Sequence, residues 1–169
     1  LFPYTTLFRS TRFGFSPART MQVAQKLYEA GHISYMRTDS TNLGAQAIAG
    51  IASIVEKKYG KDMVEIRAYK TKSKNAQEAH EAIRPTNFAV LSAGDDEQQK
   101  RLYKLIWQRA LASQMAPAKT DKTEIDIDIH PLKKSGKLPQ FVAKGEILTF
   151  DGFLKVYGGG KDDTLLPAV

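Results

Sequence analysis

The chain has 169 residues, of which 42% are hydrophobic and 25% are charged, as in an ordinary globular protein of one or two domains. It contains no cysteine, which excludes disulfides and thiolate metal sites within it, and no run of about 18 apolar residues that could span a membrane. Its 25 Lys and Arg against 18 Asp and Glu give a net charge of +7, which favours either a polyanionic partner such as nucleic acid or simple solubility.

The first helix is predicted from its ends and from the spacing of its apolar residues. Ser16 followed by Pro17 is typical of an N-cap with proline at the first helical position, and Gly31 is typical of a C-terminal stop. Apolar residues recur at helical spacing between these ends, at Met21, Ala24, Leu27 and Tyr28. The short segment 32–38 then separates this helix from the next.

A second helix is expected to be capped by Ser40 or Thr41 and to end near Gly60. Its apolar side is formed by Ile48, Ile51, Ala52 and Val55. Residues 67–74, which follow it, are basic and polar and are predicted to form a loop.

Two more helices are predicted before the composition changes. Asn75 lies three residues before Glu78, close to a capping box, and Pro85 keeps this third helix short because proline disfavours helical geometry at the residue before it. Asp95, with Gln98 three residues later, is expected to cap a long fourth helix. A proline closes this helix, and its apolar side is formed by Leu102, Leu105, Ile106, Leu111 and Met115.

The pattern changes to β-structure after about Lys119. Three isoleucines alternate with three acidic residues at the period of a half-buried strand: Ile125, Ile127 and Ile129 with Glu124, Asp126 and Asp128. Residues 141–150 predict a second strand, and Asp151-Gly152 indicates a hairpin turn into a third strand at 153–157. The predicted fold class is therefore α+β, with a helical part followed by a β-part.

The segment around Tyr35 carries the first candidate chemistry. A tyrosine hydroxyl can act as a covalent nucleophile, although a reference pKa of about 10 means that it needs help to lose its proton. Arg37 offers a fixed positive charge and a bidentate fork for a phosphate, and Thr38 and Ser40 add hydroxyl donors. Asp39 could orient Arg37. Taken alone, Tyr35 would more often be a packed aromatic residue.

A second candidate lies at residues 77–86. If these residues are helical, His80 and Arg84 share one face, which places an imidazole beside a guanidinium in an arrangement suited to holding a phosphate. The alternative is a solvated helix face on which Glu78 and Glu81 are local partners. A zinc-protease motif is excluded because its second histidine would have to stand where Arg84 does.

Two other patterns have simpler explanations than metal or nucleotide binding. The acidic residues at 124, 126 and 128 have the spacing of a carboxylate metal cluster, but an amphipathic strand with a wet acidic face explains them fully, so no metal ligand is assigned. Gly158 to Gly160 followed by Lys161 is not a P-loop, because the spacing is wrong and no Ser or Thr follows the lysine. Nothing in the sequence points to ATP.

Two long motifs resemble the signatures of one enzyme family. Residues 35–43, Tyr-Met-Arg-Thr-Asp-Ser-Thr-Asn-Leu, resemble the active-site signature of the bacterial type IA DNA topoisomerases. Residues 76–86, Ala-Gln-Glu-Ala-His-Glu-Ala-Ile-Arg-Pro-Thr, resemble the second signature of that family. Residues 10–12 and 150–153 fit the same family, so the resemblance covers about residue 10 to the C-terminus, and it is closer to the topoisomerase I branch than to the topoisomerase III branch.

The resemblance implies a role for each matching residue. Tyr35 corresponds to the nucleophile that attacks a DNA phosphodiester and forms a 5′-phosphotyrosine link, and Arg37 to the residue that stabilises the scissile phosphate. His80, Arg84, Thr38 and Ser40 are implied to bind DNA phosphate, with Asp39 and Glu81 as supporting residues. The implied reaction cleaves one strand, lets the intact strand pass and reseals the break, which relaxes negative supercoils without ATP.

The resemblance also implies a domain organisation. Residues 10–120 would form a mainly helical catalytic domain similar to a winged-helix or CAP-like module, and residues 121–169 would form part of a β-rich gate domain. Residues 1–9 resemble neither the family nor a signal peptide and are expected to be a non-native segment. The Toprim domain, which binds Mg²⁺ in the family, is expected to lie outside this chain, so the isolated chain is expected to be inactive.

The implied partners are single-stranded and negatively supercoiled DNA, bound by a monomer in the bacterial cytoplasm at the nucleoid. Three alternatives remain: a non-catalytic DNA-binding module of the helix-turn-helix type, a tyrosine recombinase or type IB enzyme that links to the 3′ side, and a purely structural helical domain. The enzyme interpretation predicts that Tyr35, Arg37 and His80 converge on one concave surface.

Overall fold

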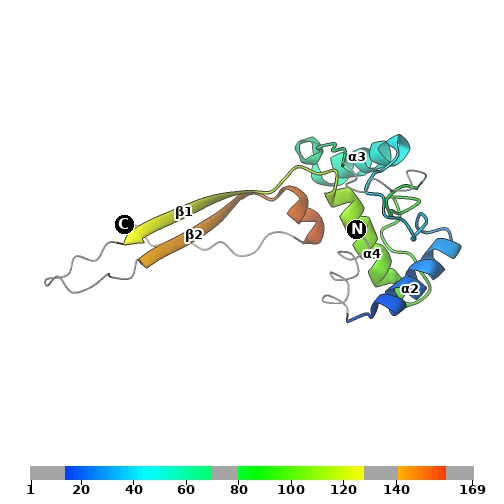
Figure 1. Ribbon diagram of the computed structural model, residues 1–169. Coiled ribbons are helices and arrows are strands. Elements are labelled where there is room, and N and C mark those ends of the chain that lie inside the picture. Colours follow the sequence, from blue (N-terminus) through cyan, green and yellow to red (C-terminus); the bar gives the residue numbers. More distant parts are fainter. Residues whose placement is uncertain (1–13, 70–79, 128–140, 159–169) are drawn as a thin grey trace, which may run out of the picture. The chain divides into compact units, whose positions relative to one another are not determined.

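The computed structural model describes residues 14–69, 80–127 and 141–158, and the chain divides into two compact units between Ala116 and Pro117 (Figure 1). The first unit is helical and the second contains a two-stranded antiparallel sheet, which confirms the α+β class. The division lies a few residues before the domain boundary expected at residues 120 and 121. Among the described helices, none is both long enough and apolar enough to cross a membrane.

Helix α2 (Pro17–Glu29) begins as the sequence predicts. The Ser16 hydroxyl accepts a hydrogen bond from the Arg19 backbone N–H at 3.2 Å, and proline occupies the first turn. Gly31 has a φ of +74°, a left-handed conformation that lets the chain turn away after the helix. Of the four apolar residues predicted to recur along it, Ala24 and Leu27 are buried, whereas Met21 is half-buried and Tyr28 is exposed; Thr20 and Val23 complete the buried side.

Helix α3 (Ala45–Tyr59) begins later than predicted, and the prediction of a cap at Ser40 or Thr41 is wrong. Its N-cap is a glycine without a side-chain hydrogen bond. The residues before it stay extended because the Asn42 carbonyl accepts a hydrogen bond from the Ala82 N–H at 2.7 Å. A tertiary contact thus outcompetes a local capping preference.

Helix α4 (Glu97–Ala112) is also capped one residue later than predicted. Asp96, rather than Asp95, is the N-cap, and its carboxylate accepts the Gln99 backbone N–H at 2.8 Å. The Gln99 side-chain amide donates to the same carboxylate at 3.2 Å, so Gln99 takes the place predicted for Gln98.

The core of the first unit lies among these three helices. Tyr103 is 1% exposed, and its hydroxyl donates to the carbonyls of Asn87 and Val90 at 3.2 and 2.9 Å. Burial raises the pKa of Tyr103, so the phenol stays neutral and the hydrogen bonds satisfy it. The remaining core side chains include Ala47, Ile51, Val55, Leu102, Leu105, Ile106 and Leu111.

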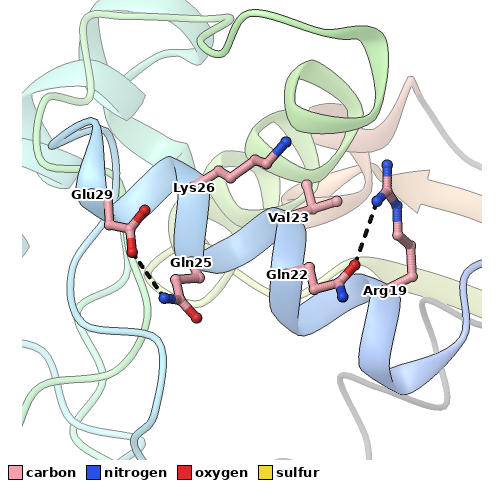
Figure 2. Close-up of a pocket in the computed structure, with 6 residues that line it drawn as sticks. All are labelled: Arg19, Gln22, Val23, Gln25, Lys26 and Glu29. Atoms are coloured by element: carbon pink, nitrogen blue, oxygen red, sulfur yellow. Dashed lines mark hydrogen bonds between the residues drawn. The ribbon is translucent and has the colours of Figure 1, made fainter.

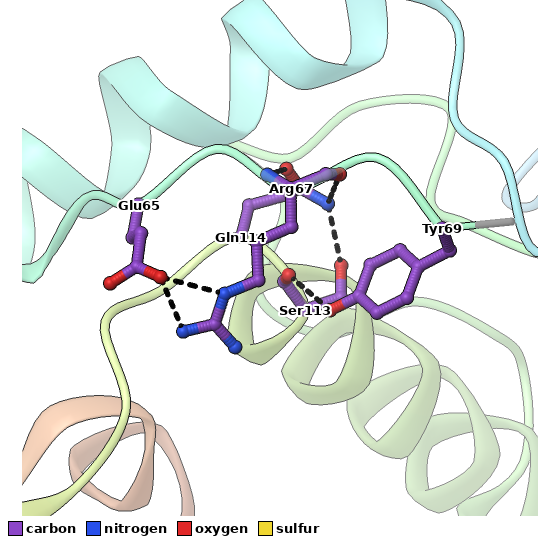
Figure 3. Close-up of polar contacts among 5 residues, drawn as sticks. All are labelled: Glu65, Arg67, Tyr69, Ser113 and Gln114. Carbon is purple, nitrogen blue, oxygen red and sulfur yellow. Dashed lines mark hydrogen bonds and ion pairs between the residues drawn. The ribbon is translucent and has the colours of Figure 1, made fainter.

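A polar network holds the chain that follows α3 against the end of α4 (Figure 3). Gln114 is 1% exposed; its side-chain oxygen accepts the Arg67 N–H at 3.0 Å and its amide donates to the Arg67 carbonyl at 3.3 Å. The Tyr69 hydroxyl donates to the Ser113 carbonyl at 2.7 Å, and Arg67 pairs with Glu65 at 2.8 Å. This network fixes the chain up to Tyr69.

The second unit contains β1 (Lys119–Ile127) and β2 (Phe141–Phe150), paired antiparallel. Oppositely charged residues face each other on one side of this ribbon, where Lys144 pairs with Glu124 at 3.1 Å. The other side carries the apolar pairs Ile125–Ala143 and Ile127–Phe141, but Ile127 and Phe141 are 47% and 49% exposed. Residues 124–127 of the predicted alternation lie in β1, and Asp128 and Ile129 lie outside the described residues. The prediction that the isoleucine side is half-buried is wrong for Ile127.

The prediction of a third strand at residues 153–157 is wrong. Residues Gly152–Tyr157 form the 3₁₀ helix η2 instead. Asp151 has helical dihedral angles, φ −61° and ψ −38°, and its carbonyl accepts the Leu154 N–H at 3.0 Å. A helical turn therefore replaces the predicted hairpin at Asp151-Gly152, and among the described strands β2 pairs with β1.

Replacing the N-cap of α4, Asp96→Ala, should lower the midpoint of thermal unfolding at neutral pH, because Gln99 loses its acceptor. The backbone hydrogen bond from Gln99 lowers the pKa of the Asp96 carboxyl. The contribution is therefore complete above the unfolded-state pKa of about 4 and is lost as the pH falls through the lower folded-state pKa. Melting curves of both proteins should converge between about pH 7 and about pH 2.

The matched control is Glu97→Ala, which removes an adjacent carboxylate whose ion pair with Arg101 is exposed. It should change the midpoint much less at neutral pH. A difference between wild type and Asp96→Ala that stayed constant over the whole pH range would contradict the role of the ionised carboxylate.

Candidate active site

Tyr35 lies in the loop that joins α2 to α3, and its ring contacts two other aromatic rings. The ring of His80 is 5.2 Å from the Tyr35 ring, centroid to centroid, at an interplanar angle of 43°. The ring of Tyr28, on the last turn of α2, meets it edge-on at 5.4 Å and is 41% exposed. The two candidate residues of the two motifs are therefore neighbours, as the sequence predicts for Tyr35 and His80.

The described end of the predicted third helix, residues 80–84, is not helical, so this part of the prediction is wrong; residues 75–79 lie outside the described residues. His80 and Arg84 therefore do not share a helix face. Instead Pro85 forms an antiparallel bridge with Ile33, which lies two residues before Tyr35. Two backbone hydrogen bonds flank it, from Ser34 N–H to Arg84 O at 2.8 Å and from Thr86 N–H to His32 O at 3.0 Å.

Proline fits the bridge because the flanking residues make the hydrogen bonds of this pair, and the missing N–H of Pro85 is not needed there. Ile33 is 1% exposed and Pro85 is fully buried, so the bridge is also a hydrophobic anchor. It brings the second motif alongside the first.

Ser34, which sequence analysis did not single out, links the two motifs through its side chain. Its hydroxyl donates to the Ala82 carbonyl at 3.1 Å and accepts the Arg84 N–H at 2.9 Å. A small hydroxyl residue directly before the candidate nucleophile was the available signal, but its partners lie far away in the sequence.

Glu81 and Arg84 form a half-buried ion pair at the start of α3. The guanidinium Nε donates to Glu81 at 2.6 Å, and Nη1 donates to the Pro85 carbonyl at 3.1 Å. The Glu81 carboxylate packs so closely on Gly44 that a Cβ added there would lie 2.0 Å from its Oε1. Glu81 therefore ties the second motif to the N-terminus of α3, where a carboxylate is favourable.

The loop after Tyr35 alternates between buried and exposed residues. Met36 and Thr38 are buried, at 4% and 8% exposure, whereas Arg37 and Asp39 are exposed. Among the described residues, Arg37 forms no ion pair, and Asp39 does not orient it. Of the three residues predicted to converge on one concave surface, Tyr35 and His80 are therefore neighbours and Arg37 is exposed on the same loop, while the concave surface stays a prediction.

The hydroxyls of Thr38 and Ser40 stabilise the loop locally. Thr38 Oγ1 accepts the Ser40 N–H at 3.1 Å, and Ser40 Oγ accepts the Asn42 N–H at 3.2 Å. These turns fix the backbone between Tyr35 and α3. Each hydroxyl can still donate its own hydrogen to an anionic oxygen.

A shallow hollow of about 310 Å³ lies along α2 (Figure 2). It is lined by Arg19, Gln22, Val23, Gln25, Lys26 and Glu29, and so includes none of the predicted site residues. Figure 2 shows Gln25 bonded to Glu29 and Arg19 to Gln22, at 2.8 and 3.4 Å. This hollow therefore does not include Tyr35, whose side chain is half-buried in the loop between α2 and α3.

No three His, Asp or Glu side chains gather in a way that could hold a metal ion within the part of the chain that the structure describes. In the acidic strand, Glu124 pairs with Lys144 at 3.1 Å. The described residues therefore do not fit a resident metal.

Comparison with known proteins identifies the family. A family model described as DNA topoisomerase matches residues 1–169. The DNA topoisomerase 1 of prokaryotic type from Acanthamoeba polyphaga mimivirus is 46% identical over 157 residues, which are 90% of this chain and 18% of the relative. DNA topoisomerase 1 of Streptomyces coelicolor is 45% identical over 159 residues, 91% of this chain and 16% of the relative.

Among solved structures, full-length topoisomerase I from Thermotoga maritima matches with a TM-score of 0.77 and 32% sequence identity, over 97% of this chain and 27% of that one. The chain thus spans less than a fifth of the length of the two curated relatives described above. The match of the family model along its whole length shows that the chain belongs to the DNA topoisomerase family.

Proposed function

We propose that the chain is the nucleophile-bearing part of a bacterial type IA DNA topoisomerase, in which Tyr35 forms a transient 5′-phosphotyrosine link with one DNA strand. The observation that carries this proposal is the position of Tyr35, which lies beside His80 in a loop held to the second motif. The match to the DNA topoisomerase family supports DNA as the substrate of this site.

The proposed reaction exchanges one phosphodiester for another. The Tyr35 oxygen attacks the phosphorus, the bond from phosphorus to the 3′ oxygen breaks, and the phenolic proton ends on the departing 3′ hydroxyl. Resealing reverses these steps. Because the phosphotyrosine retains the energy of the broken bond, the cycle needs no ATP, and passage of the intact strand relaxes negative supercoils.

Arg37 is the proposed phosphate clamp. It is exposed, and no described carboxylate neutralises its charge, so its fork is available to the phosphate oxygens beside Tyr35. His80, next to the Tyr35 ring, is proposed to contact the same phosphate or its neighbour. Further phosphate contacts are proposed for Arg84, Thr38 and Ser40, with Asp39 and Glu81 in supporting roles.

The parent enzyme is proposed to use Mg²⁺ bound by its Toprim domain. The family resemblance assigns the ion to that domain, outside this chain, and no step here passes through it; residues 14–69, 80–127 and 141–158 offer no cluster of ligands for it. The chain alone should bind single-stranded DNA in a salt-dependent way but should not relax a plasmid. We propose a monomer acting on single-stranded and negatively supercoiled DNA in the bacterial cytoplasm, at the nucleoid.

Replacing the nucleophile, Tyr35→Phe, should abolish covalent trapping of DNA while leaving non-covalent binding within about twofold of wild type, because only one hydroxyl is removed. The parent enzyme would be incubated with Mg²⁺ and a single-stranded oligonucleotide labelled at its 3′ end, then denatured. The label should migrate with wild-type protein and not with Tyr35→Phe.

The second arm uses a 5′-labelled oligonucleotide. Label on the protein in this arm alone would show a 3′ link and contradict the type IA assignment. Label in neither arm, with DNA binding intact, would favour the non-catalytic DNA-binding module. A Tyr35→Phe protein that still carried the 3′ label would place the nucleophile elsewhere.

Arg37→Ala should lower the rate of adduct formation by about 100-fold, as expected for removal of one group that stabilises the developing charge. The rate of adduct formation by Arg37→Lys should lie between the rates of Arg37→Ala and wild type, because lysine keeps the positive charge but cannot donate two parallel hydrogen bonds to a phosphate. The matched control is Arg101→Ala, which removes the same charge from the exposed face of α4. Equal losses in Arg37→Ala and Arg101→Ala would indicate general electrostatic attraction instead of a phosphate clamp.

Gly44→Ala should weaken the site through Glu81. The φ of Gly44 is −68°, which alanine adopts freely, so the effect is purely steric: the new Cβ displaces the carboxylate that holds Arg84. Because the displaced atoms are the end of a flexible, part-exposed side chain, the expected loss in the free energy of unfolding is that of the ion pair with Arg84, about 1 kcal/mol or less, with slower adduct formation in the parent enzyme.

A double-mutant cycle tests this explanation. In the Glu81→Ala background there is no carboxylate for the new Cβ to displace, so Gly44→Ala should hardly change the free energy of unfolding. The coupling free energy between the two substitutions should therefore account for most of the loss that Gly44→Ala causes alone. Additive effects in chemical denaturation would contradict the proposed contact.

A further inference from the structure

We propose that Ser34 is a positioning residue for the reaction of Tyr35, and that its hydroxyl fixes the register between the two motifs. This inference rests on the proposed function. Ser34 itself is not expected to touch DNA. It acts by holding Tyr35 and His80 at the separation that the structure shows, 5.2 Å between ring centroids.

Ser34 makes three short hydrogen bonds to the second motif. Its backbone N–H donates to the Arg84 carbonyl at 2.8 Å, and its Oγ accepts the Arg84 N–H at 2.9 Å. The same hydroxyl donates to the Ala82 carbonyl at 3.1 Å. Donor and acceptor capacities of one side chain are therefore both used by a segment far away in the sequence.

The hydroxyl provides something that the backbone pairing lacks. Around the Ile33–Pro85 bridge only two backbone hydrogen bonds form, and the N–H of Arg84 is satisfied by Ser34 Oγ, not by a carbonyl. The buried Ile33–Pro85 pair favours one register, because a slip by one residue would turn these side chains to the other face. The Ser34 side-chain bonds to Ala82 and Arg84 extend this register along the second motif toward His80.

The position of this link explains its importance for chemistry. Ser34 directly precedes Tyr35, and Ala82 lies two residues after His80. Each reactive ring is thus within two residues of an atom that the Ser34 hydroxyl holds. Displacement of a reacting group by about 1 Å can cost 100-fold in rate, so a loose register would slow cleavage without preventing DNA binding.

Thr86 offers a matched control at the other end of the same pairing. Its hydroxyl donates to the carbonyls of Gly31 and His32 at 2.7 and 3.2 Å. Thr86→Val therefore removes a hydroxyl that bonds to backbone across the same two segments. These bonds lie at the end of the pairing next to α2, so the substitution leaves the Ser34 hydrogen bonds to Ala82 and Arg84 intact.

The experiment compares Ser34→Ala, Ser34→Thr and Thr86→Val in the parent enzyme with Mg²⁺. The rate of adduct formation on a 3′-labelled oligonucleotide and the Kd for the same oligonucleotide without cleavage are measured separately. We expect Ser34→Ala to form adduct at least tenfold more slowly with Kd unchanged. Ser34→Thr, which keeps the hydroxyl, and Thr86→Val should stay within about threefold of wild type.

A second readout reports the register without catalysis. Histidine labelled with carbon-13 is introduced into the same proteins, and the His80 signal is assigned by its absence in His80→Gln. The nearby Tyr35 ring displaces this signal by its ring current. Ser34→Ala should move it toward the position of free histidine, while Ser34→Thr and Thr86→Val should not.

Each outcome decides the question. Wild-type rates and an unmoved His80 signal in Ser34→Ala would overturn the inference, as would equal losses in Ser34→Ala and Thr86→Val, which would indicate a general structural role. A weaker Kd that accounted for the whole loss would make Ser34 a DNA contact instead. If wild type formed no adduct, the proposed function would fail, while a moved His80 signal would still support the register role.

Discussion

The candidate site depends on one short antiparallel pairing, in which residues 32–34 lie against residues 84–86. Its centre is the buried pair Ile33 and Pro85, and its hydrogen bonds come from the residues on either side. Together with the hydrogen bond from the Ala82 N–H to the Asn42 carbonyl, it joins the two motifs. In this arrangement the candidate nucleophile Tyr35 and the imidazole of His80 are neighbours. The helices supply the rigid support, and the loops carry the reactive groups.

The same pairing explains where the sequence analysis succeeded and failed. The ends of α2 and the apolar side of α4 are set by local signals, a proline after a serine cap and a helical repeat of buried residues, so they were predictable within one residue. The late start of α3 and the non-helical residues 80–84 were not predictable, because both follow from hydrogen bonds between segments distant in the sequence. A strong local turn signal at Asp151-Gly152 likewise produced a 3₁₀ helix.

For the site, the sequence predicted which types of residue take part, but it did not predict which of them hold the others in place. Tyr35 and His80 could be paired in advance from their motifs, and the structure brings them together. Ser34 could not be identified, since a serine is chemically unremarkable until its partners are known. Glu81 illustrates the reverse case: its contact with Gly44 shows why a glycine stands at the start of α3, although the φ of that residue requires none.

The arginines of the two motifs differ in their exposure and in their ion pairing. Arg84 is anchored by Glu81 and by the Pro85 carbonyl, so its side chain is oriented before any substrate arrives and its charge is largely balanced. Arg37 is exposed, with no ion pair to any described residue, so an arriving phosphate would meet it with its full charge. Ordering Arg37 costs side-chain entropy, which a bidentate phosphate contact offsets. One motif therefore contributes an arginine whose side chain is already oriented and whose charge is balanced, and the other an arginine whose charge is available to an anion, as the proposed phosphate clamp requires.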